Sequence, residues 1–161
     1  MSRVGINFHS SVLDNPDGLR LLQPRWGLFL VDPEETWNTT LGLWPQVKTL
    51  SPDCKPMCRL YRPDVMAEPP EKRAKQFCAI LTEHFGDQPV DAIPGNELDL
   101  DHEHAGSDYS LSWAGPNGLS LIADWLSHYA DAHRALRPQD ILHLPACSAE
   151  MDLLDWLQAM P

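Results

Sequence analysis

Five short apolar runs recur along the chain, and they constrain its fold more than any other feature. Each run is almost continuously apolar until a polar, Pro or Gly residue ends it, which is typical of parallel strands covered on both faces. We expect buried strands at Val4–His9, Trp26–Asp32, Met57–Pro63, Val90–Glu97 and Ile141–Ser148. These strands alternate with helix-like stretches, so the sequence predicts an α/β fold.

The stretches between the runs show helical periodicity. Pro70–Phe85 repeats apolar residues at helical spacing, begins with Pro and is followed by Gly86. Gly118–Leu136 carries a similar apolar stripe, and Pro138 stops it. Weaker helical signals lie in Asp17–Leu22, in Thr36–Leu50, which Pro45 interrupts, and after Ser148.

Alternating strands and helices predict a parallel sheet with right-handed crossovers, either open and doubly wound or part of a barrel. Five units in 161 residues give about 32 residues per unit, and a complete eight-unit barrel of ~250 residues has about 31. The sequence contains neither GxGxxG nor GxxxxGK[ST], which disfavours a nucleotide-binding open sheet. We therefore expect residues 1–161 to form a single incomplete TIM (β/α) barrel domain, about five β/α units of eight.

Charge and composition narrow the range of partners. The chain has 23 acidic and 12 basic residues and a formal net charge of −11, so a nucleic-acid partner is not expected. No apolar run approaches the ~20 residues that cross a bilayer, and no secretory signal is visible, so we expect a cytoplasmic protein without membrane contact. The lone C-x3-C of Cys54 and Cys58 has no second pair, so all the cysteines, with Cys78 and Cys147, are expected to be buried thiols.

Polar side chains stand at the end of every expected strand. Catalytic groups in parallel β/α architectures lie at the carboxyl ends of the strands. The residues at these ends are His9, Asp32, Arg59 or Arg62, Asn96 with Glu97, and His143 or Ser148. Because the carboxyl ends converge on one rim, we expect a functional site there.

The segment PGNELDL, Pro94–Leu100, places Asn-Glu at the end of the expected fourth strand. It resembles the signature of retaining glycoside hydrolases of the eight-stranded β/α-barrel clan, usually Asn-Glu-Pro and in some members Gly-Asn-Glu-Pro-Asp. Leu98 departs from the common residue, whereas Asp99 follows the variant. The resemblance implies that Glu97 is the general acid/base and that Asn96 hydrogen-bonds the sugar 2-hydroxyl.

The resemblance extends more loosely to two further segments. WGLFLVD, which ends at Asp32, and RLYRPD, which contains Arg59 and Arg62, look like the second and third strands of such barrels. This similarity implies that Arg59 or Arg62 orients the catalytic carboxylates. A carbohydrate substrate, no cofactor and no metal are expected on this interpretation.

The chemistry of a glycosidase sets conditions on these residues. A general acid must be protonated near neutral pH, so the pKa of Glu97 must rise from ~4.3 toward ~6 in apolar surroundings beside another carboxylate. A retaining enzyme also needs a second carboxylate about 5–5.5 Å away, which the clan places on the seventh strand. We expect a fragment that lacks this strand; otherwise Asp32 substitutes, or the protein no longer hydrolyses sugars. An unclosed sheet would leave an edge through which the chain forms a homo-oligomer.

Other interpretations remain open for the same region. Asn96 and Glu97 also fit the start of a turn. Asp99–His104 has the spacing to supply nitrogen and oxygen ligands to a divalent metal, which predicts a metal-dependent hydrolase, although a solvated polar loop fits as well. Trp113, in the long connection Leu98–Asn117, is placed to stack on a sugar ring. A non-catalytic carbohydrate-binding module is the third alternative.

Overall fold

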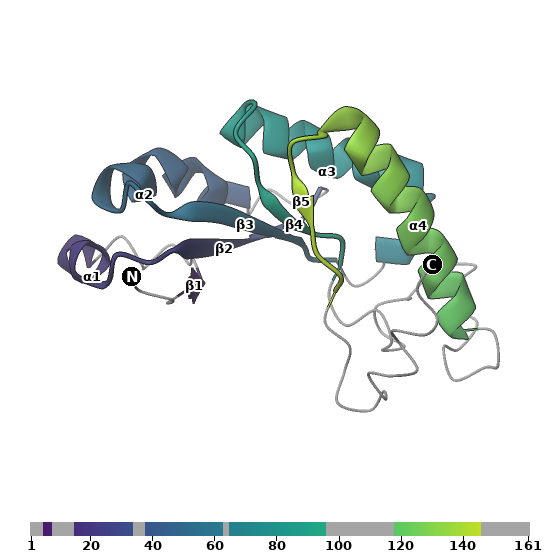
Figure 1. Ribbon diagram of the computed structural model, residues 1–161, viewed down its shortest axis with the longest axis horizontal. Coiled ribbons are helices and arrows are strands. Elements are labelled where there is room, and N and C mark those ends of the chain that lie inside the picture. The colour runs from purple at the N-terminus through teal and green to yellow at the C-terminus, as the bar shows by residue number, and fades with distance from the viewer. Residues whose placement is uncertain (1–4, 8–14, 34–37, 63–64, 96–117, 146–161) are drawn as a thin grey trace.

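The computed structural model describes residues 5–7, 15–33, 38–62, 65–95 and 118–145 (Figure 1). The elements in chain order are β1 (Gly5–Asn7), α1 (Pro16–Leu22), β2 (Trp26–Val31), the 3-10 helix η2 (Asn38–Leu43), α2 (Trp44–Leu50), β3 (Lys55–Leu60), the 3-10 helix η3 (Val65–Ala67), α3 (Pro70–Phe85), β4 (Asp91–Ile93), α4 (Gly118–Leu136) and β5 (Ile141–Leu142). The expected α/β class is confirmed.

The strands form one parallel sheet in the order β1-β2-β3-β4-β5, so each strand pairs with the next strand of the chain. Phe29 pairs with Cys58, Cys58 with Ala92, and Ala92 with Leu142. Right-handed crossovers between sequential parallel strands place their helices on one side of the sheet. Figure 1 shows α2, α3 and α4 together on one side.

The helix-covered face of the sheet holds the core. Phe29, Val31, Cys58, Leu60 and Ala92 alternate onto this face and are fully buried. Phe29 packs edge-on against Trp44 of α2 and Phe85 of α3, with ring centroids 6.0 Å away in each case. Burial of each such large side chain stabilises the fold by about 1.5–3 kcal/mol, so this aromatic cluster fixes both helices on the sheet.

The opposite face carries the alternate residues, and we call it the second face. It comprises Leu28, Leu30, Met57, Arg59, Asp91, Ile93, Ile141 and His143, together with Asp32 just past the end of β2. Six of these nine residues are partly buried or exposed, in contrast to the fully buried core row, while Asp32, Asp91 and Ile93 are buried. The polar residues among them are the starting point for the functional site.

Helix boundaries follow the sequence pattern closely. The helices expected at Pro70–Phe85 and Gly118–Leu136 have those bounds in the structure. Gly86 ends α3 with a φ of 57°, a conformation that glycine adopts at little cost. Pro45 lies in the first turn of α2, where a proline is tolerated, so α2 begins there and is not interrupted.

The strands occur where the sequence predicts them but are shorter. β3 begins at Lys55, ahead of the expected start at Met57, because its pairing with β2 begins at Trp26 and Lys55. β4 ends at Ile93 and β5 at Leu142, well before the expected ends. The helix expected after Ser148 lies outside the described residues.

The cysteines that the structure describes are free and buried, as predicted. Burial raises the pKa of Cys54 to about 11 and that of Cys78 to about 12, although nearby cations oppose the shift. These thiols therefore stay protonated at neutral pH and are unsuited to nucleophilic or metal-binding roles. Cys147 lies outside the described residues.

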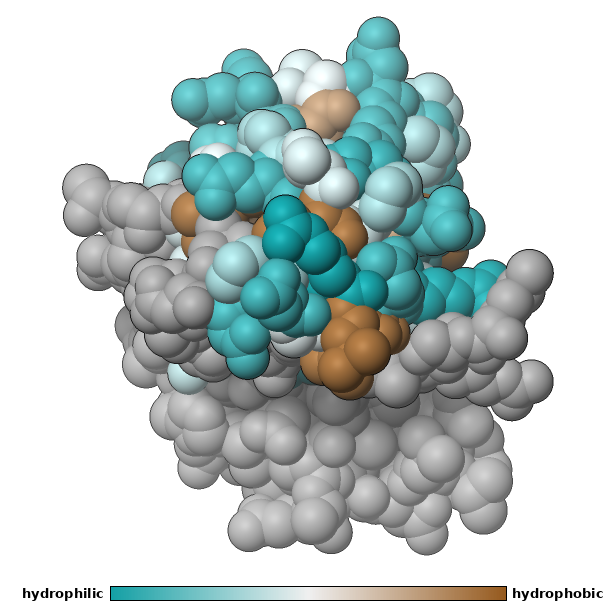
Figure 2. All heavy atoms as spheres, turned by 90° about the vertical axis from the view of Figure 1, so that its left-hand side faces the viewer, coloured by the Kyte–Doolittle hydropathy of each residue, from teal (hydrophilic) through white to brown (hydrophobic). Residues whose placement is uncertain are grey.

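The coloured surface beside α1 and α2 is mainly hydrophilic, with one larger hydrophobic area and a few smaller ones (Figure 2). α1 leaves Leu21 and Leu22 exposed, while Leu19 is buried in the core. No helix in the described part of the chain has both the length and the apolar character that a bilayer crossing requires.

Candidate functional site

The structure describes part of the predicted site. Asp32, Arg59 and Arg62 are placed, as is His143. The predicted residues that lie outside the described parts of the chain are His9, Asn96, Glu97, Trp113, Ser148 and the cluster Asp99–His104.

Asp32 and Arg62 meet where β2 and β3 end. Arg62 Nη1 donates to Asp32 Oδ1 over 3.1 Å, and both side chains are largely buried. The Tyr61 amide donates to the Val31 carbonyl at 2.9 Å, so the two strands remain paired up to the ion pair. A shielded pair of this kind holds its geometry better than an exposed one. It thus fixes a carboxylate and a cation at the carboxyl ends of two neighbouring strands.

Arg59 lies one step further into the sheet. It pairs in register with Leu30 of β2 and Ile93 of β4, and its side chain belongs to the second face. Ile93 is the last residue of β4, the strand that leads into the Gly-Asn-Glu motif. The two candidate arginines therefore differ in their surroundings. Arg62 is paired with Asp32, whereas Arg59 lies beside β4, the strand that precedes the Gly-Asn-Glu motif.

A glycine turn follows β4. Gly95 has a φ of 138°, which side-chain-bearing residues rarely adopt, and its amide donates to the Ile93 carbonyl at 3.0 Å. Pro94 and Gly95 are both buried. The backbone conformation after the fourth strand therefore requires glycine at position 95, the first residue of the Gly-Asn-Glu motif.

An additional pair, formed by Asp91 and His143, was not identified from the sequence. His143 Nε2 lies 2.6 Å from Asp91 Oδ1, and both side chains belong to the second face. Asp91 begins β4, whereas the expected site residues lie at the carboxyl ends of the strands. A charged residue inside the apolar run VDAI was the available signal, because a carboxylate at such a position needs a partner.

A third polar cluster joins α3, α4 and β4 at the amino end of the sheet. Arg137 donates to Asp140 and to the carbonyls of Gly86 and Gln88, while Asp140 also accepts from the Val90 amide and contacts His133. Burial raises the pKa of Asp140, but the hydrogen bonds from His133, Arg137 and Val90 outweigh it, so the net pKa is lowered. This network is buried and saturated, which indicates a structural role.

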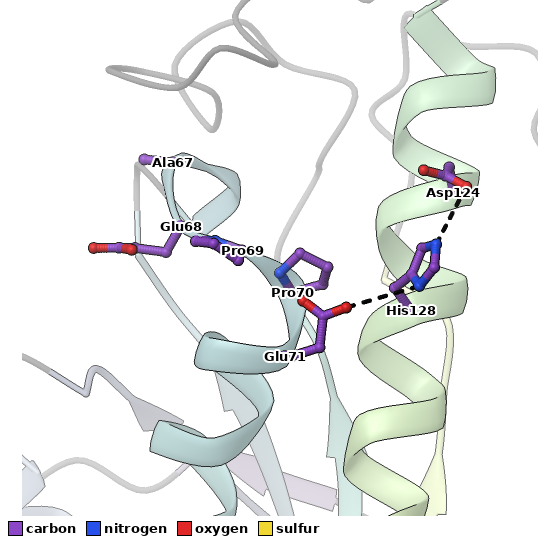
Figure 3. A pocket seen from close by; sticks show the side chains of 7 residues that line it. All are labelled: Ala67, Glu68, Pro69, Pro70, Glu71, Asp124 and His128. Carbon is purple, nitrogen blue, oxygen red and sulfur yellow. Dashed lines mark ion pairs between the residues drawn. The ribbon is translucent and has the colours of Figure 1, made fainter.

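A hollow of about 430 Å³ lies at the start of α3 and faces α4. Its lining includes Pro69, Pro70, Glu71, Asp124 and His128 (Figure 3). His128 Nδ1 lies 3.8 Å from Glu71 and Nε2 lies 3.7 Å from Asp124, so the carboxylates approach opposite sides of the ring and share no common ligand point. Within the described ranges, no three His, Cys, Asp or Glu side chains are grouped to hold a metal.

Comparisons with protein-family models, with curated proteins and with solved structures gave no match to this chain. Its function is therefore inferred from its own residues and their arrangement.

Proposed function

We propose that this chain is the amino-terminal, five-unit portion of a β/α-barrel glycoside hydrolase of the retaining type, with Glu97 as the acid/base residue. The observation that carries the proposal is the sequential order of the parallel strands. An open doubly wound sheet changes direction at a switch point and places helices on both faces. A barrel keeps sequential order and places its helices outside, and the described strands and helices fit that second pattern.

The second face would line the interior of such a barrel. It presents Asp32 and Arg59, and Arg62 joins Asp32 at the rim. A cation on this face favours the ionised form of a nearby carboxylate, and the nucleophile of a retaining glycosidase must be ionised. Arg59 is suited to that role because its side chain belongs to the face that would line the barrel interior, where the nucleophile would also lie.

In the proposed mechanism, Glu97 first donates its proton to the leaving glycosidic oxygen. It then accepts a proton from the water that breaks the glycosyl-enzyme intermediate. Asn96 binds the sugar 2-hydroxyl, and this contact strengthens as the ring becomes oxocarbenium-like. The nucleophile comes from a strand beyond the five described, so the 161-residue chain alone is expected to hydrolyse aryl glycosides little or not at all.

Sugar binding to the 161-residue chain tests this proposal. We expect a panel of mono- and oligosaccharides, titrated by calorimetry, to contain at least one ligand. Arg59→Met should weaken its binding about tenfold, which corresponds to about 1.4 kcal/mol, while Glu97→Gln should leave binding nearly unchanged. Arg134→Met, on the exposed side of α4, is the matched control.

Two results would contradict the proposal. If the folded chain binds no member of the panel, the carbohydrate assignment is wrong. If the chain alone rapidly hydrolyses aryl glycosides, its site is complete, and the five-unit portion is the wrong description.

A further inference from the structure

Among the described residues, three histidines contact carboxylates, and the three contacts differ in geometry and exposure. The ring of His128 is 58% exposed and lies 3.7–3.8 Å from two exposed carboxylates. Pairs of this kind contribute little, because water screens them. His128 is therefore an ordinary surface residue.

His133, by contrast, is fully buried together with its carboxylate partner. Its side chain and that of Asp140 are both 0% exposed, and Nε2 lies 2.9 Å from Asp140 Oδ2. Its other ring nitrogen, Nδ1, lies 3.4 Å from the Tyr129 hydroxyl. Both ring nitrogens have protein partners and no ligand can reach them, so this pair serves the fold.

His143 combines a tight partner with access to solvent. Its Nε2 lies 2.6 Å from Asp91 Oδ1, the Asp91 side chain is 12% exposed, and the imidazole is 42% exposed. The backbone is held as well, since the His143 amide donates to the Ala92 carbonyl at 2.9 Å. The sheet therefore fixes the backbone and a nearly buried carboxylate fixes the ring.

This arrangement determines which ring nitrogen is the base. A carboxylate only accepts hydrogen bonds, so a neutral His143 carries its proton on Nε2, toward Asp91. The lone pair is then on Nδ1, and protonation there gives an imidazolium that the Asp91 carboxylate stabilises. A histidine that a carboxylate orients and whose ring is 42% exposed is the kind of arrangement that proton-transfer sites use.

A hollow at the amino ends of β3, β4 and β5 reaches Asp91, one member of the pair, while His143 lies outside its lining. Its volume is about 420 Å³, and its lining includes Lys55, Asp91 and Ile141, the first residues of β3, β4 and β5. This volume lies within the range of small-molecule sites. His143 extends the same face toward the carboxyl ends, in the row of Arg59 and Ile93.

We propose that His143 and Asp91 form a proton-accepting contact for a hydroxyl-bearing small molecule on the second face of the sheet. His143 Nδ1 accepts a hydrogen bond from a ligand hydroxyl and, where the hydroxyl is acidic enough, accepts its proton; the proton returns to the oxygen when the ligand leaves. Asp91 acts through His143 and is a positioning residue. The identification of the ligand as a carbohydrate rests on the proposed function, whereas the pair itself does not.

Nitrogen-15 NMR of the histidine rings and acylation by diethyl pyrocarbonate test the pair without any sugar. We expect neutral His143 to carry its proton on Nε2 and to be acylated faster than the more exposed His128. Asp91→Asn should slow acylation of His143 about tenfold. This is the lower end of the roughly 10- to 100-fold loss of function that follows removal of a group that orients a histidine. Asp124→Asn, which removes a partner of His128, should leave His143 unchanged.

Buried His133 reports whether each variant is folded, because it should remain unmodified. The proposal is overturned if neutral His143 carries its proton on Nδ1, a measurement that needs no variant. It is also overturned if Asp91→Asn leaves the acylation rate of His143 unchanged while His133 stays protected.

Protection by sugar separates this inference from the proposed function. A sugar found by the calorimetric panel should slow acylation of His143 but not of His128. If a sugar binds without protecting His143, the contact proposed here is wrong while the carbohydrate assignment stands. If no sugar binds, the carbohydrate assignment fails, and the tautomer and acylation rates alone decide whether the pair accepts protons.

Discussion

Asp140 shows how a single side chain can join three elements of this fold. Its carboxylate accepts from the Val90 amide of the segment leading into β4 and from Nε and Nη2 of Arg137, and it contacts His133 of α4. Arg137 in turn reaches the Gly86 and Gln88 carbonyls after α3. Both carboxylate oxygens of Asp140 accept hydrogen bonds. An amide side chain has only one oxygen and could not accept all of them.

Asp140→Asn should therefore destabilise the protein strongly. The amide NH2 group would oppose at least one of the donors and leave a buried cation without its counter-charge, which costs about 3–5 kcal/mol. Chemical unfolding followed by circular dichroism measures the change. Asp131→Asn, which alters an exposed pair with Arg134, should cost less than about 1 kcal/mol. Equal effects of the two substitutions would show that the network does not stabilise the fold.

The lowered pKa of Asp140 also predicts an acid limit for stability. The ionised form is favoured by folding, so its contribution is present above the ordinary carboxyl value of 3.8 and is lost as the pH falls through the lower folded pKa. Urea unfolding between pH 7 and pH 2 should show the wild-type advantage over Asp140→Asn shrinking below about pH 4. An advantage that grows with acidification would contradict the assignment.

At the scale of elements, sequence reasoning succeeded where the pattern is local and regular. The bounds of α3 and α4 follow from an apolar stripe that ends at Gly86 or Pro138, both read directly from neighbouring residues. Strand ends were less predictable, because pairing depends on how far the neighbouring strand extends. β4 ends at Ile93 although its apolar run continues into Pro94.

The end of α3 offers a direct test of backbone conformation. Gly86 has a φ of 57° and a ψ of −133°, and a Cβ added there would have no atom within 4 Å. Gly86→Ala should therefore cost about 1–3 kcal/mol through backbone strain alone. Gly42→Ala, in η2, also meets nothing within 4 Å and should be nearly neutral. Thermal unfolding of both variants gives the comparison, and equal melting temperatures would exclude strain at Gly86.

Contacts between distant residues were beyond the sequence pattern. Asp91 and His143 are 52 residues apart, and Arg137 and Gln88 are 49 apart. Whether such residues meet depends on the register of neighbouring strands, and a shift of one residue would turn the side chains of a strand to the other face. Asp32 and Arg62 follow strands that were expected to be neighbours, but the sequence pattern did not predict that the two side chains pair.

At the scale of the whole molecule, sequential strand order separates two environments. Helices cover one face, which is apolar, and the second face carries the ion pair Asp32–Arg62, Arg59 and the pair Asp91–His143. Structural polar groups gather at the amino end around Asp140, while the candidate site occupies the second face and the carboxyl ends. The structural network around Asp140 is therefore separate from the Asp32–Arg62 pair at the carboxyl ends, although Asp91 also begins its strand near the amino end.

The last strand of this sheet predicts how the molecule associates. β5 pairs with β4, and Ile141 at its start and Leu144 just after it are 54% and 50% exposed. Among the described residues β5 has no strand on its other side, and exposed apolar side chains beside such an edge favour pairing with another chain. We expect self-association of the 161-residue chain to increase from micromolar to millimolar concentration in sedimentation velocity.

Ile141→Lys should reduce this association, because a charge beside the strand would have to be buried on pairing. Leu136→Lys is the matched control, since Leu136 is 52% exposed but lies at the end of α4 rather than in the sheet. If association proceeds through β5, only the first substitution should shift the sedimentation coefficient toward the monomer value. A wild-type chain that stays monomeric throughout, or two variants with the same effect, would show that β5 is not the contact and that its apolar residues are covered within one chain.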